Sequence, residues 1–223
     1  MSTSPTSLFS RERTFPQEFE GDEILASGDY HRTAALANPN KIMTGKVVPF
    51  LEQQGVKRVL DYGCGRFLRD SAYLAKRGMA VDAVDLDAQV ARIIAERREG
   101  VRALRSLSHS ILSDEYDAAL LNFVITVLPE EAQRKKMLSD VSERVRSGGY
   151  LVASVRSRAD MLLHAGKNAR PYKDGFLIGR NDGTTTFHKG YDHCEFLDLL
   201  ESVSLRPLNF YSSFTAFVCV AQK

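Results

Sequence analysis

The 223-residue sequence has little cysteine and no long hydrophobic run. Its three cysteines, Cys64, Cys194 and Cys219, are dispersed, form no CxxC pair and are odd in number, so we expect reduced thiols. No stretch approaches the roughly 20 consecutive apolar residues that a membrane span needs. The start of the chain, Met1–Pro5, lacks the apolar core of a signal peptide. These absences predict a cytoplasmic protein that does not enter a membrane.

The sequence also lacks a strong excess of either charge. Thirty Lys and Arg against 28 Asp and Glu give a formal net charge of +2, which argues neither for nor against nucleic-acid binding. The hydrophobic fraction of 43% is ordinary for a protein that buries a core. We expect an N-terminal arm over residues 1–30, disordered or forming a lid, because it opens with Ser, Thr, Pro and charged residues. One domain is expected over residues 31–223.

A glycine-rich turn is the most informative feature that is present. An apolar run enters Asp61-Tyr62-Gly63-Cys64-Gly65, a helix pattern follows, and a second apolar run ends on Asp85. Gly63 and Gly65 allow the backbone to approach a ligand closely. Asp85, at the tip of the next strand, is placed to accept hydrogen bonds from both hydroxyls of a ribose. This layout is typical of a nucleotide-binding β-loop-α-β unit.

The third small residue of a dinucleotide site is missing. Such a site has Gly or Ala three positions after the second glycine, where this chain has Leu68. A NAD-dependent oxidoreductase is therefore the weaker alternative. The Asp-x-Gly-x-Gly turn instead resembles motif I of the class I S-adenosylmethionine-dependent methyltransferases. Phe67 departs from that motif, because many members have a third glycine there, and we expect its side chain to narrow the floor of the pocket.

This resemblance implies S-adenosylmethionine as the cofactor. The cofactor-binding residues that it implies are Asp61, Gly63, Cys64, Gly65, Asp85, Leu86, Ser106 and Asn122. Among them, Asp61 is expected near the methionine amino group and Asp85 at the ribose. After the third strand many relatives have an acid that holds the adenine amino group, and here Ser106 or, as the alternative, Ser108 is expected to replace that acid less strongly.

Apolar runs and helical patterns alternate along the rest of the chain. Strands are expected near 57–61, 79–85, 101–105, 117–123 and 149–155, and helices near 40–54, 67–77, 87–98, 130–146 and 193–201. This alternation implies a mostly parallel sheet with helices on both faces. After an irregular stretch near 157–190, Leu205–Tyr211 and Phe214–Ala221 are expected to form an antiparallel hairpin. The expected fold is α/β, the Rossmann-like seven-stranded methyltransferase fold.

The end of the fourth strand and the segment that follows the fifth strand are the expected acceptor side. In the family, Asn122 and Phe123 lie where residues contact cofactor or substrate; the alternative is a strand cap and a core residue. Residues 156–190 hold seven Lys and Arg against three Asp, a net charge of +4. This charge predicts that Arg156 and Arg170 bind an anionic acceptor. A solvated basic loop is the alternative.

Histidines and a tyrosine supply the candidates for catalysis. His188, His193 and Cys194 fit no common zinc spacing, so no metal is expected. Three further segments, around His31-Arg32, Leu121–Val127 and Thr186–Tyr191, resemble a bacterial family of DNA phosphorothioation-associated putative methyltransferases. This resemblance implies that His31, His188 and Tyr191 are catalytic candidates and that Arg32 and Phe123 contact the acceptor. A surface role for His31 and Arg32 is the alternative.

The sequence thus predicts a methyltransferase that uses S-adenosylmethionine on a small or medium-sized acceptor, and the charge of residues 156–190 favours an anionic one. The near-neutral charge and the lack of an appended binding module favour such an acceptor over nucleic acid. A DNA or tRNA acceptor, a NAD-dependent oxidoreductase and a non-catalytic cofactor-binding scaffold are the alternatives. We expect a monomer or a homodimer.

Overall fold

The computed structural model describes residues 40–97, 101–106, 115–165, 169–179 and 185–223. The arm over residues 1–30, together with His31, Arg32 and Ser108, lies outside the described residues. Within the described part of the chain, no helix is long and apolar enough to cross a membrane.

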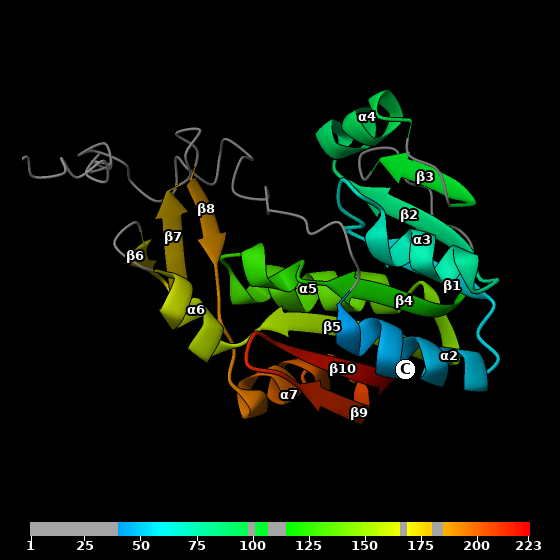
Figure 1. Ribbon diagram of the computed structural model, residues 1–223. Coiled ribbons are helices and arrows are strands. Elements are labelled where there is room, and N and C mark those ends of the chain that lie inside the picture. Colours follow the sequence, from blue (N-terminus) through cyan, green and yellow to red (C-terminus); the bar gives the residue numbers. More distant parts are fainter. Residues whose placement is uncertain (1–39, 98–100, 107–114, 166–168, 180–184) are drawn as a thin grey trace, which may run out of the picture.

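A seven-stranded sheet forms the centre of the molecule (Figure 1). Its order is β3 (Ala103–Ser106), β2 (Ala80–Asp85), β1 (Arg58–Tyr62), β4 (Tyr116–Asn122), β5 (Val145–Arg156), β10 (Ala216–Gln222) and β9 (Arg206–Ser212). The strands from β1 to β5 are parallel, and β10 runs antiparallel to both β5 and β9. The expected fold and its closing hairpin are confirmed.

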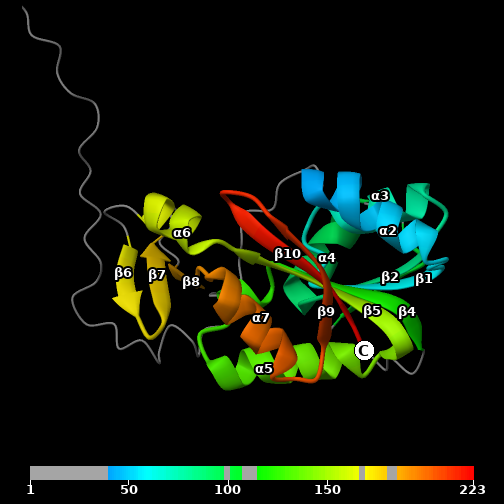
Figure 2. The same ribbon diagram turned by 90° about the horizontal axis from the view of Figure 1, so that it is seen from below.

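Helices cover both faces of this sheet (Figure 2). The helices of the main domain are the π-helix η2 (Met43–Val47), α2 (Val48–Gln53), α3 (Arg69–Lys76), α4 (Asp87–Ala95), the 3-10 helix η4 (Ile125–Val127), α5 (Glu131–Ser142) and α7 (His193–Glu201). On one face, α5 and α7 pack apolar side chains such as Leu138 and Phe196 onto the sheet. On the other face, η2, α2 and α3 contribute Val47, Leu51 and Leu74. Apolar burial on both faces explains why the central strands read as continuous hydrophobic runs.

The fifth strand begins earlier than the sequence pattern indicates. We expected a helix to residue 146 and a strand from 149, but α5 ends at Ser142 and β5 starts at Val145. Val145 is the partner of Tyr116 on β4, and the register shifts before Ala118. Gly148 has a φ of +73°, a value that Gly adopts without strain, so the pattern Ser-Gly-Gly lies within an irregular strand rather than at a helix end.

The described residues of the segment after β5 lie mostly in regular elements, which corrects the irregular stretch that we expected over 157–190. It forms α6 (Arg158–Ala165) and a three-stranded antiparallel sheet of β6 (Ala169–Tyr172), β7 (Gly175–Gly179) and β8 (Thr185–His188). Leu177 and Phe187 are fully buried in this sheet. A Cβ at Gly175 would collide with the Phe187 ring, so only glycine allows this close packing. The small sheet lies beyond the carboxyl end of β5 (Figure 1).

Candidate functional site

The glycine-rich turn joins β1 to α3 and is fixed by the neighbouring strand ends. Gly63 has a φ of +78°, and its N–H donates to the Val84 carbonyl at 2.8 Å. A Cβ at Gly63 would collide with Val124, which follows β4. Gly65 also has a positive φ, +68°. Both glycines are therefore required by the backbone, and the turn is held between the ends of β2 and β4.

Asp85, at the end of β2, is held by the same turn. Its carboxylate accepts hydrogen bonds from the N–H groups of Gly65 and Leu86, each at 2.7 Å, and lies 3.8 Å from the Cys64 Sγ. Burial raises the pKa of Asp85, and these donors oppose that rise. Ser106 is the register partner of Asp85 on β3, and its hydroxyl bonds to Asp87 at the start of α4. The structure thus brings together the residues expected at the adenosine end of the cofactor.

Two further buried carboxylates lie beside this turn. Asp61, at 2% exposure, accepts a hydrogen bond from Ser71 Oγ at 2.5 Å. Burial raises the pKa of Asp61 to about 7, and the charges of Asp70 and Asp85 add to that rise. Asp70 lies in the first turn of α3 and was not among the predicted site residues. Its only sequence signal is that of an acid at a helix start, where the helix dipole alone accounts for it.

Asn122 connects the end of β4 to this acidic pair. Its Nδ2 donates to Asp70 Oδ2 at 3.0 Å, and its Oδ1 accepts from Ser154 Oγ at 2.9 Å. Phe123, the next residue, has a φ of +59°, which is strained for an aromatic side chain. Its half-buried ring lies 6.0 Å from the guanidinium of Arg69. Such strain at the carboxyl end of a strand is a common mark of a ligand site.

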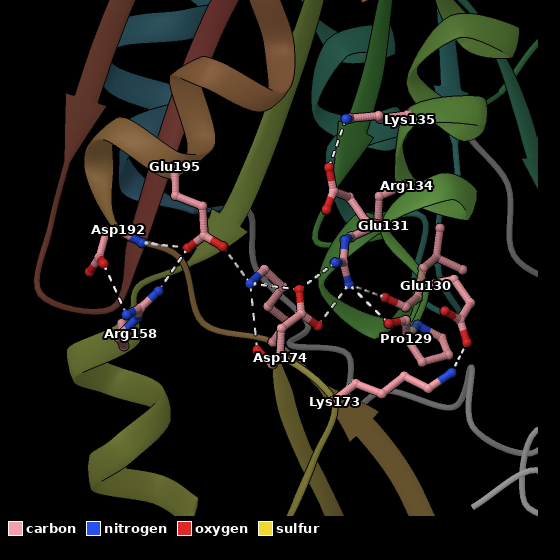
Figure 3. Close-up of polar contacts among 12 residues, drawn as sticks. Pro129, Glu130, Glu131, Arg134, Lys135, Arg158, Lys173, Asp174, Asp192 and Glu195 are labelled. Carbon is pink, nitrogen blue, oxygen red and sulfur yellow. Dashed lines mark hydrogen bonds and ion pairs between the residues drawn. The ribbon is translucent and has the colours of Figure 1, made fainter. Parts of the chain in front are cut away.

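Several cations of residues 156–190 are paired with carboxylates, so fewer of them are left to bind an anion than the composition suggests. Arg156 pairs with Asp160 at 2.5 Å, and Arg158 pairs with Asp192 at 3.1 Å and with Glu195 at 2.9 Å. Lys173 pairs with Glu130 (Figure 3). Arg170, in β6, is half-buried opposite Leu177 of β7. Partners outside residues 156–190 therefore neutralise part of the net charge of +4.

A buried ionic cluster anchors the small sheet to α5 and α7 (Figure 3). The Lys189 ammonium lies 3.0 Å from Asp174 Oδ2 and 2.5 Å from Glu195 Oε1. Arg134 donates to the Leu128 carbonyl at 2.8 Å and to both oxygens of Asp174. Both cations are buried, at 3% and 2% exposure. This cluster was not predicted, because Lys and Arg residues are expected at the surface.

One of the predicted catalytic residues, Tyr191, lies at this cluster, and another, His188, directly precedes Lys189 in the chain. Tyr191 is 1% exposed, its hydroxyl has no partner among the described residues, and Lys189 Nζ is 4.8 Å from its ring centre. Burial raises the pKa of Tyr191 well above its usual value. His188 Nε2 is 3.0 Å from Thr186 Oγ1. Across the described ranges, no group of three or more His, Cys, Asp and Glu is arranged to hold a metal ion.

Backbone contacts join this part of the molecule to the cofactor edge. The Lys189 N–H donates to the Thr126 carbonyl at 2.8 Å, and the Thr126 hydroxyl donates to the Phe123 carbonyl at 2.6 Å. The end of β8 therefore lies against the turn that follows β4. This contact places the small sheet beside the edge where β4 ends at Asn122 and Phe123 follows it.

A family model described as "Tellurite resistance protein TehB" matches residues 29–167. The chain belongs to this family. It is also 32% identical over 104 residues to the ribosomal protein L11 methyltransferase of Chromobacterium violaceum. That match covers 45% of this chain and 33% of the relative, so it spans about a third of the relative's length.

Solved structures share the fold over most of the chain. A SAM-dependent methyltransferase of Methanosarcina mazei has a TM-score of 0.62 at 20% identity, covering 78% of this chain and 97% of that one. The 1,6-didemethyltoxoflavin-N1-methyltransferase of Burkholderia thailandensis, solved with S-adenosylhomocysteine, has a TM-score of 0.55 at 18% identity over 99% of each chain. The chain is thus a member of the class I methyltransferase superfamily, whose cofactor is S-adenosylmethionine.

Proposed function

We propose that this protein transfers a methyl group from S-adenosylmethionine to a small or medium-sized acceptor. The observation that carries the proposal is the Asp85 carboxylate, which is held by the Gly65 and Leu86 N–H groups at the end of β2. A carboxylate in this position suits the two hydroxyls of a ribose. The membership of the TehB family and the antiparallel hairpin of β9 and β10 favour S-adenosylmethionine over a dinucleotide.

The buried groups near the turn fit the rest of this cofactor. When bound, S-adenosylmethionine supplies an activated methyl group. Asp85 and Ser106 would hold the adenosine, and Asp61 would face the amino-acid end. The backbone of Gly63, Cys64 and Gly65 would line the site between them.

The acceptor is proposed to enter between the Phe123 turn and the small sheet. Phe123 would cover the reacting atoms and exclude water, and Arg170 would meet an anionic group of the acceptor, whereas Arg156 is already paired with Asp160. Positioning of the acceptor accounts for much of the rate in this proposal. The buried Tyr191 hydroxyl, whose pKa is raised by burial, is poorly suited to act as a base. His188 is the remaining described candidate for proton transfer, and His31 and Arg32 stay predictions.

Ion pairing favours a small acceptor over nucleic acid. Arg156, Arg158 and Lys173 are each paired with a carboxylate. A nucleic-acid backbone is bound through cations that exchange counterions for phosphates, and paired cations contribute less to such binding.

Calorimetric titration with S-adenosylhomocysteine and with NAD tests the cofactor. We expect S-adenosylhomocysteine to bind and NAD not to bind; the reverse result would overturn the proposal.

Transfer of label from methyl-tritiated S-adenosylmethionine tests the acceptor. A cell extract is divided into a dialysable fraction and a nucleic-acid fraction, and each is incubated with the protein. Label is expected in the dialysable fraction. Label in the nucleic acid would identify the alternative acceptor, and cofactor binding without transfer to either fraction would favour a scaffold.

A further inference from the structure

One carboxylate oxygen beside the glycine-rich turn has no hydrogen-bond partner within the part of the chain that the structure describes. Asp70 is 6% exposed, and its Oδ1 is buried without a hydrogen-bond partner among the described residues. The other oxygen, Oδ2, accepts from Asn122 and lies 3.4 Å from Arg69 Nε. A buried carboxylate oxygen without a donor is costly, so such an atom in a folded protein calls for an explanation.

The orientation of the Asp70 side chain is fixed by hydrogen bonds that lead back to the central sheet. Ser154 Oγ on β5 donates to Asn122 Oδ1 on β4 at 2.9 Å, and Asn122 Nδ2 donates to Asp70 Oδ2 at 3.0 Å. This chain of hydrogen bonds starts in two central strands and ends at the first turn of α3. It fixes Oδ2 and leaves Oδ1 buried without a donor among the described residues. Supporting hydrogen bonds of this kind are typical of groups that are held ready for a ligand.

A second buried acid adds negative charge to the same place. Asp61 is bonded to Ser71, the residue that follows Asp70 in α3. Burial raises the pKa of both acids, and the charge of Asp70 contributes to the rise at Asp61. Two carboxylates that are buried this close together favour a cation between them. Arg69 meets this need only in part, because it lies on the Oδ2 side of Asp70.

We propose that Asp70 binds the α-ammonium group of the cofactor, with Oδ1 accepting one of its hydrogen bonds. This inference rests on the proposed function, which supplies the cofactor. An ammonium group has three donors and no acceptor, so it matches a carboxylate oxygen that lacks a donor. Asp61 lies beside Asp70 and would share the charge, while Asn122 and Ser154 act as positioning residues. The same chemistry would suit an amine of the acceptor, and the experiment distinguishes the two sources.

The test compares two ligands on Asp70→Asn. S-adenosylhomocysteine carries the ammonium group, whereas 5′-methylthioadenosine has the same adenosine and sulfur without the amino-acid end. Asn keeps the shape of Asp and removes the charge. A hydrogen bond to a charged group contributes enough that its loss weakens binding about 10- to 100-fold. We expect this loss for S-adenosylhomocysteine and less than about a twofold change for 5′-methylthioadenosine.

Asp85→Asn is the matched control, since it removes a carboxylate from the adenosine end. It is expected to weaken both ligands alike. The ratio of the two affinities within one variant does not depend on the fraction of folded protein. If Asp70→Asn does not fold, Asn122→Ala serves as the second variant, because it removes the support of Oδ2 and leaves the charge. Asn122→Ala is expected to lower the ratio of the affinity for S-adenosylhomocysteine to that for 5′-methylthioadenosine, by a smaller factor than Asp70→Asn.

Three results would overturn the inference about Asp70. One is an unchanged affinity of Asp70→Asn for S-adenosylhomocysteine. Another is an equal loss for both ligands, which would assign Asp70 to the adenosine or to the fold. The third is a raised KM for the acceptor with unchanged cofactor affinity, which would assign the carboxylate to an acceptor amine. Failure of the unmodified protein to bind S-adenosylhomocysteine would instead overturn the proposed function.

Discussion

Replacing Asp61 by Asn is expected to stabilise the unliganded protein while weakening cofactor binding. Asp61 is buried next to Asp70, and Ser71 is its one close hydrogen-bond donor among the described residues. Its ionised form is therefore unfavourable in the folded state until a cationic ligand arrives. Removal of the charge relieves this cost and also removes a group that the ligand needs. Opposite effects on stability and on binding are typical of functional sites.

The size of the effect follows from the pKa. The pKa of Asp61 rises from 3.8 to about 7 in the folded state, because of burial and then of the neighbouring charges. Each unit corresponds to about 1.4 kcal/mol, so the ionised carboxylate costs at most about 4 kcal/mol. Asn introduces a buried N–H group without a partner, which costs about 1–3 kcal/mol. The expected net gain is about 1–3 kcal/mol, and each kcal/mol raises Tm by about 2–4 °C in a domain of this size.

The effect of Asp61→Asn on the stability of the unliganded protein depends on pH. Between the unfolded pKa of 3.8 and the folded value of about 7, the folded protein keeps a proton on Asp61 that the unfolded chain has released. The contribution of Asp61 to stability is thus lost as pH rises through this window. Asp61→Asn removes this loss, so its advantage in Tm is expected to be absent near pH 4 and complete above about pH 7.

Thermal unfolding across this pH range is the assay, and Asp117→Asn is the control. Burial acts to raise the pKa of Asp117, but hydrogen bonds from Arg146, Arg58 and Lys57 outweigh it and lower the pKa. Its replacement is therefore expected to destabilise the protein near neutral pH, the opposite sign. An Asp61→Asn difference in Tm that stays constant between about pH 4.5 and about pH 8 would refute the reasoning.

Three other substitutions test separate parts of the account. Asp85→Ala is expected to weaken S-adenosylhomocysteine binding by a few kcal/mol in calorimetry, because the ribose loses its charged acceptor; unchanged binding would show that the ribose lies elsewhere. Arg170→Ala is expected to raise the KM of the acceptor more than the Kd of the cofactor, and equal losses would reassign it to the cofactor. Arg134→Met is expected to cost about 1–3 kcal/mol in urea unfolding, because the Leu128 and Pro129 carbonyls lose a buried donor while Asp174 keeps its ion pair with Lys189. The surface pair of Lys136 provides its control, since Lys136→Met is expected to cost less than about 1 kcal/mol.

The central sheet and the glycine-rich turn were predictable because their signals are local. Strands buried on both faces read as apolar runs, as at Val59-Leu60 and Leu120-Leu121, which are fully buried. The turn has a fixed spacing from Asp61 to Gly65, and the distance to Asp85 is set by one helix and one strand. Such patterns need no knowledge of distant contacts.

The small sheet of β6 to β8 was missed because its apolar signal is weak. Leu177 and Phe187 are its fully buried apolar residues; Leu177 lies in the short run Phe176-Leu177-Ile178, and Phe187 lies between Thr186 and His188. An apolar run of three residues and one isolated phenylalanine are too short to indicate a set of strands. Close packing at Gly175 then depends on the Phe187 ring, which the sequence does not place.

The buried charges were missed because their partners come from distant elements. Arg134 and Asp174 are separated by 40 positions in the sequence, and Asn122 and Asp70 by 52. A charged residue type predicts exposure unless a partner is known. The role of Asp70 therefore emerges only when β4 brings Asn122 next to α3.

A crystal structure of the protein with S-adenosylhomocysteine tests the central claim most directly. The account predicts that both ribose hydroxyls lie on the Asp85 carboxylate and that the ammonium group lies within hydrogen-bond distance of Asp70 Oδ1. A ligand bound at another edge of the sheet, or no ligand at the Gly63–Gly65 turn at saturating concentration, would contradict it.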